Sequence, residues 1–191
     1  MISGQGQGTD SNRWVVGTDV QPGWYKITPI GLGSYESIDD NIVLNVEGND
    51  SNGFLLDNDI IGAFFGNDVS DGEISSYQAY LTAGQVIEIQ NNDVSGTADQ
   101  GLRLQALSTR SSTTAISSGT LGAGIYEVGV DIQPGTYTVT ALQGGGYLTT
   151  NDINVDLNLG TDYGDTSTAT ITLKTGEFLT STMNKLSISQ K

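Results

Sequence analysis

Acidic side chains gather in several short clusters, and calcium binding is the chemistry that such clusters are suited to. Calcium takes about six to eight oxygen ligands, which carboxylates and amides on a loop supply. None of the clusters has the D-x-[DN]-x-[DN]-G spacing of a helical calcium loop. Asp and Asn also end strands, because they tolerate turn geometry. The sequence therefore favours turns and predicts no cofactor, with Ca²⁺ as the alternative at four residues: Asp57, Asp59, Asp68 and Asp71.

A two-carboxylate hydrolase is the class of enzyme that the composition leaves open. The chain has no His and no Cys, which removes disulfides, the usual zinc sites and every Ser-His or Cys-His catalytic arrangement. The segment Asp165-Thr166-Ser167 is the nearest match to an aspartic-protease loop, but it occurs once and lacks the following Gly. We therefore expect no enzymatic activity and no catalytic residues.

The charge of the chain is strongly one-sided, with 7 Lys and Arg against 22 Asp and Glu and a net charge of −15. Nucleic acid and anionic lipid are bound by clustered basic side chains, and the sequence has no such cluster. It also has no apolar run close to the ~18 residues that a membrane helix needs. The sequence thus argues against nucleic-acid and membrane partners, and the like charge keeps copies apart until specific contacts form.

An internal repeat organises the chain. Residues 16–28 have the sequence VGTDVQPGWYKIT and residues 128–140 have VGVDIQPGTYTVT, an offset of 112 residues. The match runs without a gap to Tyr35 and Tyr147 and continues with gaps beyond them. Two related modules in tandem are the simplest explanation of this repeat.

The repeated signature has the chemistry of a turn followed by a strand. Pro and Gly at the second and third positions of Gln-Pro-Gly-x are typical of a type II turn. A preceding Asp can accept hydrogen bonds from N–H groups of the turn. The alternation of apolar and polar residues that follows indicates a half-buried strand. The predicted structural residues are Asp19, Pro22 and Gly23 in the first copy and Asp131, Pro134 and Gly135 in the second.

The same alternation recurs along the chain, between clusters of Gly, Asn and Asp, and no amphipathic helix longer than two turns is evident. We therefore predict an all-β protein of two tandem, jelly-roll-like β-sandwich modules joined by a Ser/Thr/Gly-rich linker. The predicted organisation is a polar N-terminal arm (1–12), module 1 (13–107) with an insertion near 49–74 that adds one or two strands, the linker (108–124) and module 2 (125–191).

Aromatic residues are the best candidates for contact with a partner. Trp24 is predicted to point outward beside Lys26, and it corresponds to Thr136 in the second copy, so the fold does not require it. An outward Trp can stack on a sugar ring or anchor a protein interface. The predicted residues of an interface or glycan contact are Trp24, Lys26, Phe64 and Phe65.

The signature Val-Gly-x-Asp-Ile-x-Pro-Gly-x-Tyr, followed by Leu-x-x-Gly-(Gln/Glu) ahead of a hydrophobic strand, resembles small β-modules in Gram-positive surface lipoproteins and phage-encoded proteins. The resemblance covers most of both modules. It implies a β-sandwich in an extracellular or virion setting and carries over no catalytic residue.

The start of the sequence favours the phage setting, because it has a Met and neither an export signal nor a lipid-anchor Cys. We expect a non-catalytic structural protein at the virion surface of a bacteriophage, as a capsid decoration, fibre or tail accessory component. The expected partners are other virion proteins or copies of the same chain, with a host surface glycan as a further ligand. The alternative is a secreted or cell-surface binding or adhesion protein of a Gram-positive bacterium.

Overall fold

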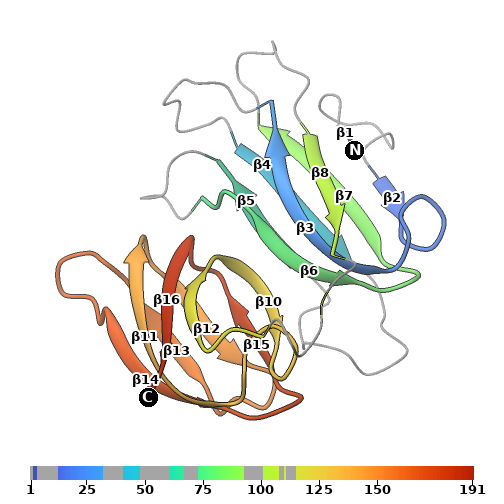
Figure 1. Cartoon of the computed structure of the whole chain (residues 1–191). Coiled ribbons are helices and arrows are strands. Elements are labelled where there is room, and N and C mark those ends of the chain that lie inside the picture. Colours follow the sequence, from blue (N-terminus) through green and yellow to red (C-terminus); the bar gives the residue numbers. More distant parts are fainter. Residues whose placement is uncertain are drawn as a thin grey trace. The chain divides into compact units, whose positions relative to one another are not determined.

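A computed structural model gives the fold of the chain (Figure 1). It describes residues 2–3, 13–31, 41–47, 61–66, 73–92, 101–107, 110 and 115–191. These residues contain sixteen strands and no helix, which confirms the predicted all-β class. The chain forms two compact units: unit 1 is Met1–Asp68 with Glu73–Leu107, and unit 2 is Val69–Gly72 with Ser108–Lys191.

Unit 1 contains the first eight strands of the chain. They are β1 (Ile2–Ser3), β2 (Arg13–Val15), β3 (Gly23–Ile30), β4 (Asn41–Glu47), β5 (Ile61–Phe65), β6 (Tyr77–Leu81), β7 (Val86–Asn92) and β8 (Gly101–Ala106). Within the unit they are ordered β1-β8-β3-β6 in one layer and β2-β7-β4-β5 in the other. Every neighbouring pair in these two layers is antiparallel.

Unit 2 contains the other eight strands. They are β9 (Ser118–Leu121), β10 (Ala123–Glu127), β11 (Gly135–Gln143), β12 (Gly146–Thr150), β13 (Asp156–Leu159), β14 (Thr168–Leu173), β15 (Phe178–Ser181) and β16 (Lys185–Gln190). Their order is β9-β16-β11-β14 in one layer and β10-β15-β12-β13 in the other, again with antiparallel neighbours.

The two units have the same topology, which is that of a jelly roll. In each unit the first strand pairs with the eighth, the second with the seventh, the third with the sixth and the fourth with the fifth. This is the pairing of one long antiparallel hairpin folded over into two layers. Strands β1 to β8 therefore correspond one to one with β9 to β16.

The first strand of each unit begins earlier than the sequence pattern indicates. β1 lies within the segment predicted as a polar arm (1–12), and β9 begins within the segment predicted as a linker (108–124). Both strands are short, and β9 has the sequence Ser-Gly-Thr-Leu, of which Leu121 alone is buried. The alternation in such strands is too weak to separate them from a linker.

The sequence suggested that the strand at Ile61–Phe65 is an addition to module 1, but the structure shows otherwise. This strand, β5, pairs with β4 just as β13 pairs with β12, so it belongs to the common fold. Unit 1 is longer than unit 2 mainly because its connections are longer. Residues 31–40 join β3 to β4 where unit 2 has Gly144 and Gly145, and residues 48–60 join β4 to β5 where unit 2 has 151–155.

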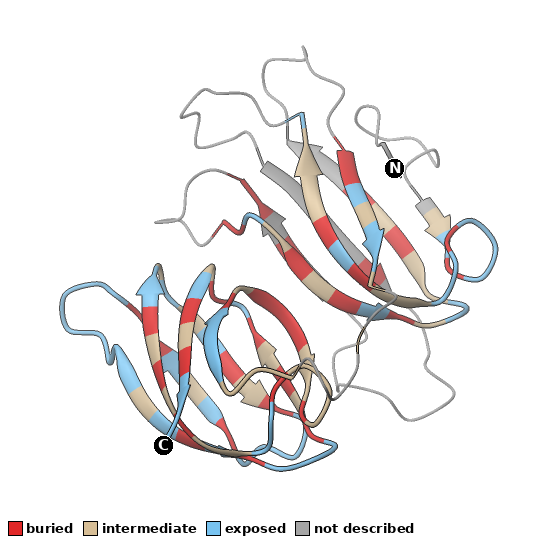
Figure 2. Ribbon diagram, in the orientation of Figure 1, coloured by how far each residue is buried: buried red, intermediate tan, exposed pale blue. Residues whose placement is uncertain are grey.

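Alternating side chains build the core of each unit, as the red bands along the strands in Figure 2 show. In unit 2, β11 buries Tyr137 and Val139, and the strands beside it bury Ile171, Leu186 and Ile188. Leu148, Leu159 and Leu179 of the opposite layer belong to the same cluster, as does Met183 in the connection after β15. Complete burial of one such side chain stabilises a fold by about 1.5–3 kcal/mol. These contacts hold the two layers of the unit together.

Candidate binding face

The repeated signature forms the same hydrogen-bonded turn in both units. In unit 1 the Asp19 carboxylate accepts a hydrogen bond from the Val15 N–H at 2.8 Å, and the Gly17 N–H donates to the Val20 carbonyl at 2.6 Å. Gly17 has φ +95°, a conformation that favours glycine. The matching contacts in unit 2 join Glu127 to Asp131 at 2.8 Å and Gly129 to Ile132 at 2.7 Å, with φ +100° at Gly129.

This turn lies earlier in the chain than the predicted type II turn at Gln-Pro-Gly. Gly23 has φ +148°, far from the value near +80° of that turn type, and it is the first residue of β3, paired with Leu81. Gly135 has φ +155° and begins β11 in the same way. Pro22 and Pro134 thus lead directly into a strand, and the two Asp carboxylates stabilise the turn before it.

In each unit, a tyrosine of the strand forms a hydrogen bond back to the residue before the Pro-Gly pair of the signature. The Tyr25 hydroxyl donates to the Gln21 carbonyl at 2.7 Å, and the Tyr137 hydroxyl donates to the Gln133 carbonyl at 2.5 Å. Both rings are buried. The residues that recur in the two copies therefore position the third strand of each jelly roll and belong to the framework.

An aromatic pair lies on the outward side of that strand in unit 1. Trp24 on β3 is the register partner of Tyr80 on β6, and their ring centroids are 5.4 Å apart with the planes at 56°. Trp24 is half-buried and Tyr80 is 40% exposed. Trp24 can be identified from the sequence but Tyr80 cannot, because only the pairing of β3 with β6 brings the two rings together.

Basic and amide side chains continue this face along the strands, beyond the aromatic pair. Lys26, the next outward residue of β3, lies opposite Gln78 on β6 and Gln105 on β8, and Thr28 lies opposite Arg103. None of the described residues that point outward from β3, β6 and β8 is acidic. We call this set the aromatic face; it comprises Trp24, Lys26, Thr28, Ile30, Gln78, Tyr80, Arg103 and Gln105.

The corresponding face of unit 2 has a different chemistry. Thr136 and Thr172 are register partners at the positions that Trp24 and Tyr80 hold in unit 1, and their hydroxyl oxygens are 3.2 Å apart. A second such pair, Thr140 and Thr168, also lies at 3.2 Å. We call this set the hydroxyl face; it comprises Ser118, Thr120, Thr136, Thr138, Thr140, Thr168, Thr170, Thr172, Ser187 and Ser189.

The other predicted contact residues do not join the aromatic face. Phe65 points inward from β5 and is fully buried, so its predicted role in a contact is wrong: the alternation of β5 assigns it to the core. The side chain of Phe64 lies outside the described residues, as do Asp57, Asp59, Asp68 and Asp71. In the part of the chain that the structure describes, no three acidic side chains are close enough together to hold a metal ion.

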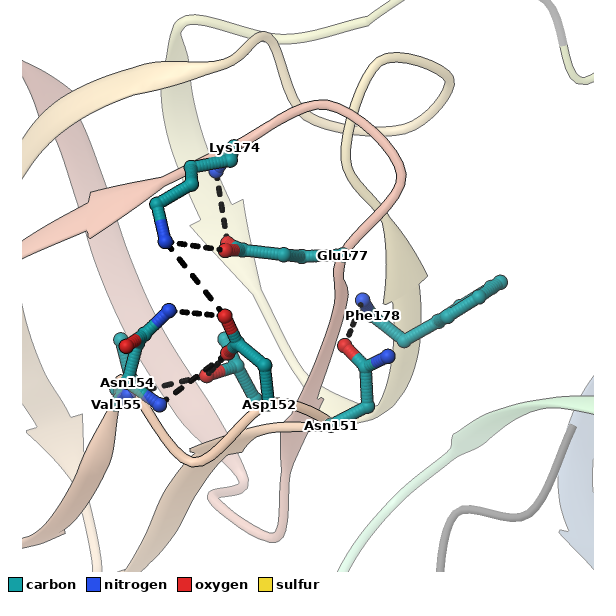
Figure 3. A network of polar contacts seen from close by, with 8 residues as sticks. Asn151, Asp152, Asn154, Val155, Lys174, Glu177 and Phe178 are labelled. Atoms are coloured by element: carbon teal, nitrogen blue, oxygen red, sulfur yellow. Dashed lines mark hydrogen bonds and ion pairs between the residues drawn. The ribbon is translucent and has the colours of Figure 1, made fainter.

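A network of polar contacts in unit 2 is a second cluster of chemically active groups (Figure 3). Asp152 accepts hydrogen bonds from the Thr150 hydroxyl at 2.8 Å and from the backbone and side-chain nitrogens of Asn154. The hydrogen bond from Thr150 holds the pKa of Asp152 below its ordinary value, and the nearby Lys174 acts in the same direction. Asp152 is therefore an ionised acceptor.

Lys174 joins this carboxylate to a second one. The Nζ of Lys174 lies 3.4 Å from Glu177 Oε1 and 3.7 Å from Asp152 Oδ2. The backbone N–H of Lys174 donates to Glu177 Oε2 at 2.8 Å. The three side chains link the β12–β13 turn to the β14–β15 turn (Figure 3). Lys174 thus bridges the two turns through its contacts with Asp152 and Glu177.

A half-open groove of about 410 Å³ lies beside the network, between β13 and β14. Val155, Leu157 and Ile171 supply its apolar lining, and Asn154, Asp156, Thr170, Thr172 and Lys174 supply its polar lining. Asp165, the residue of the protease-like segment, lies elsewhere in a turn, where its carboxylate accepts from the Asp162 N–H at 3.2 Å. The structure thus gives Asp165 a turn-forming role.

The described residues contain no helix that is long and apolar enough to cross a membrane. Comparison of the chain with protein-family models, with curated proteins and with solved structures finds no match to any of them.

Proposed function

We propose that the chain is a non-catalytic structural protein at the surface of a bacteriophage virion, as a capsid decoration, fibre or tail accessory component. One observation supports this proposal above the others. The two units share a jelly-roll framework, down to the hydrogen bonds of the Asp19 and Asp131 turns, while equivalent outward positions carry Trp24 and Tyr80 in one unit and Thr136 and Thr172 in the other. A duplicated framework with two different faces suits a protein that makes two different contacts.

Charge and fold agree with such a role. The net charge of −15 keeps free copies apart until they meet specific contacts. Jelly rolls occur in viral capsid and lectin domains, so the fold is at home both in particles and in surface binding.

The experiment is to ask whether the chain travels with particles. Particles are purified on a density gradient from a lysate of the cells that produce the chain, washed at high salt and analysed by mass spectrometry and immunogold electron microscopy. We expect the chain in the particle fraction at a fixed ratio to the main shell protein, with label on the particle surface. Its recovery only in the soluble fraction would contradict the proposal.

The second candidate is a secreted or cell-surface binding protein of a Gram-positive bacterium, and the aromatic face favours it. Trp24 and Tyr80 form an outward aromatic pair on which host surface material can pack. Surface biotinylation of intact cells separates the candidates, because an adhesion protein is labelled in cells that produce no particles. In that case Trp24→Ala lowers adhesion to host material, while the chain remains absent from particles.

A further inference from the structure

We infer that the aromatic face of unit 1 binds a glycan that carries a carboxylate. The inference deepens the proposed function, on which it rests, by naming the ligand class for one of the two outward faces. It is argued from the register of β3, β6 and β8 and from the distribution of charge along the chain.

The aromatic pair supplies the surface on which a sugar ring can stack. Trp24 and Tyr80 are tilted by 56° with centroids 5.4 Å apart, and Tyr80 is 40% exposed. The C–H groups on one side of a sugar ring pack on an aromatic face, while the polar end of Tyr stays available for hydrogen bonds. The equivalent pair in unit 2, Thr136 and Thr172, lacks this surface.

Two cations extend the same face along the strands. Lys26 follows Trp24 by two residues on β3, and Arg103 lies opposite Thr28, two residues further on. Lys26 is the register partner of Gln105, and Arg103 lies two residues before Gln105 on β8, so Lys26 and Arg103 are diagonal neighbours. The Cβ atoms of such neighbours are about 7 Å apart, which lets two long side chains reach one anionic group. The planar guanidinium of Arg103 can donate two parallel hydrogen bonds to a carboxylate.

Amide side chains complete the hydrogen-bonding capacity. Gln78 and Gln105 lie on either side of Lys26, one on β6 and one on β8. Each amide can both donate and accept, as sugar hydroxyls require. Thr28 adds a hydroxyl opposite Arg103.

The composition of the face favours a glycan over a protein partner. The centres of protein interfaces are rich in apolar side chains. Among the described residues of the aromatic face, Tyr80 is the one large apolar side chain that is exposed. Most of the other members are polar: two amides, a hydroxyl and two cations. Such a surface places several hydrogen-bonding groups beside one stacking platform.

The charge of the chain favours a carboxylate over a phosphate. Residues 13–107 contain 14 acidic residues and 3 basic ones, and Lys26 and Arg103 are two of those three. The field of this surplus extends about 8 Å from the surface at physiological salt. A carboxylate brings one negative charge, which the two cations of the face can neutralise, whereas a phosphate monoester brings nearly two and meets more repulsion from the acidic surplus.

The experiment uses the full chain and a matched pair of ligands. Binding of an oligosaccharide that contains uronic acid is measured by calorimetry. It is compared with binding of the neutral oligosaccharide in which the carboxyl group is reduced to an alcohol, and with binding of a phosphate-bearing glycan. We expect the uronic-acid ligand to bind about tenfold more tightly than the neutral one, since charge-assisted hydrogen bonds supply that margin. Affinity should fall as salt rises, because two of the contacts are ionic.

Variants locate the site. Arg103→Gln is expected to remove the preference for the acidic ligand, and Trp24→Ala to weaken both ligands by about tenfold or more. The matched control is Lys185→Gln, which removes one positive charge on β16 of unit 2 and should leave binding unchanged. Circular dichroism shows whether each variant is folded. If Trp24→Ala does not fold, the result for Arg103→Gln decides the test.

Several outcomes would overturn the inference. These are no binding of the acidic glycan by the folded chain, an equal loss in Lys185→Gln, or tighter binding of the phosphate ligand. Loss of particle incorporation in Trp24→Ala without glycan binding would make the face a protein interface. Glycan binding by a chain that is absent from particles would refute the virion proposal and leave the inference standing, so the two fail separately.

Discussion

Tyr137 donates its hydroxyl hydrogen to the backbone carbonyl of Gln133 over 2.5 Å, from a ring that is completely buried in the core of unit 2. Replacement of Tyr137 by Phe keeps the ring and removes this one hydrogen bond. We expect Tyr137→Phe to lower the free energy of unfolding of unit 2 by about 1 kcal/mol, the usual net value of such a bond. Urea denaturation followed by circular dichroism measures it.

Unit 1 provides the matched control for this prediction. Tyr25 makes the same contact with Gln21 at 2.7 Å, so Tyr25→Phe should lower the stability of unit 1 by a similar amount. Both tryptophans, Trp14 and Trp24, lie in unit 1, and tryptophan fluorescence therefore follows unit 1 alone. If both variants denature at the wild-type urea concentration, the tyrosines do not stabilise the signature.

The two Asp residues of the turns are predicted to differ in their effects. Asp19 accepts one hydrogen bond from its turn, so Asp19→Ala should cost about 1 kcal/mol. Asp131 also accepts from Arg110, with Nε at 2.8 Å and a further contact from Nη2, and the Arg110 side chain is only 12% exposed. Asp131→Ala removes this ion pair from a largely buried side chain as well as the turn hydrogen bond, and it should cost about 3 kcal/mol.

A double-mutant cycle tests the origin of that difference. If the extra cost of Asp131→Ala comes from the lost ion pair with Arg110, then Arg110→Ala combined with Asp131→Ala should destabilise by less than the sum of the two single variants. Additive effects in urea denaturation would show that Arg110 and Asp131 act independently and would contradict the explanation.

Alternation allowed much of the framework to be predicted from the sequence. Tyr25 and Ile27 were expected on one side of their strand and Trp24 and Lys26 on the other, and the burial of β3 has this pattern. The absence of a helix from the described residues follows from the same period-2 pattern. Such predictions succeed because neighbouring residues of a strand point to opposite faces.

Properties that depend on strand pairing could not be predicted in this way. Tyr80 is 56 residues from Trp24 along the chain, and only the register of β3 with β6 makes them neighbours. The gapless repeat match to Tyr147 is also misleading, because β12 corresponds to β4. Val46 pairs with Ile87 in unit 1, and Thr150 pairs with Leu179 in unit 2. Val46 therefore corresponds to Thr150, and the offset between β4 and β12 is 104 residues instead of 112. The local sequence match does not show that the connection before β4 is longer than the connection before β12.

Backbone strain at Ile153 predicts a stabilising substitution. Ile153 has φ +62°, a conformation that a β-branched residue seldom adopts, and its side chain is 75% exposed. Asn tolerates this conformation and loses little buried surface here, so Ile153→Asn should raise the stability of unit 2 by about 1 kcal/mol. The matched control is Leu142→Asn, which replaces an exposed apolar residue on β11 and should give no gain. A gain in both variants would point to the removal of an apolar side chain and not to strain.

Tyr126 predicts how unit 2 responds to alkaline pH. Burial raises the pKa of Tyr126 from 10.0 to about 12, and its hydroxyl contacts both the carbonyl and the N–H of Gly122 at 3.1 Å. Because the pKa is higher in the folded chain than in the unfolded one, the stability that this neutral hydroxyl contributes is complete below pH 10 and is lost as the pH rises towards 12. The shift corresponds to about 2–3 kcal/mol.

The measurement is the free energy of unfolding of unit 2 by urea and circular dichroism, at a series of pH values from neutral to 12. Tyr126→Phe should be less stable at neutral pH, since it lacks the two contacts with Gly122, but it should lose less stability through the alkaline window. Some loss should remain in the variant, because burial also raises the pKa of Tyr137. Parallel curves for the wild type and Tyr126→Phe would show that the titration of Tyr126 is not linked to folding.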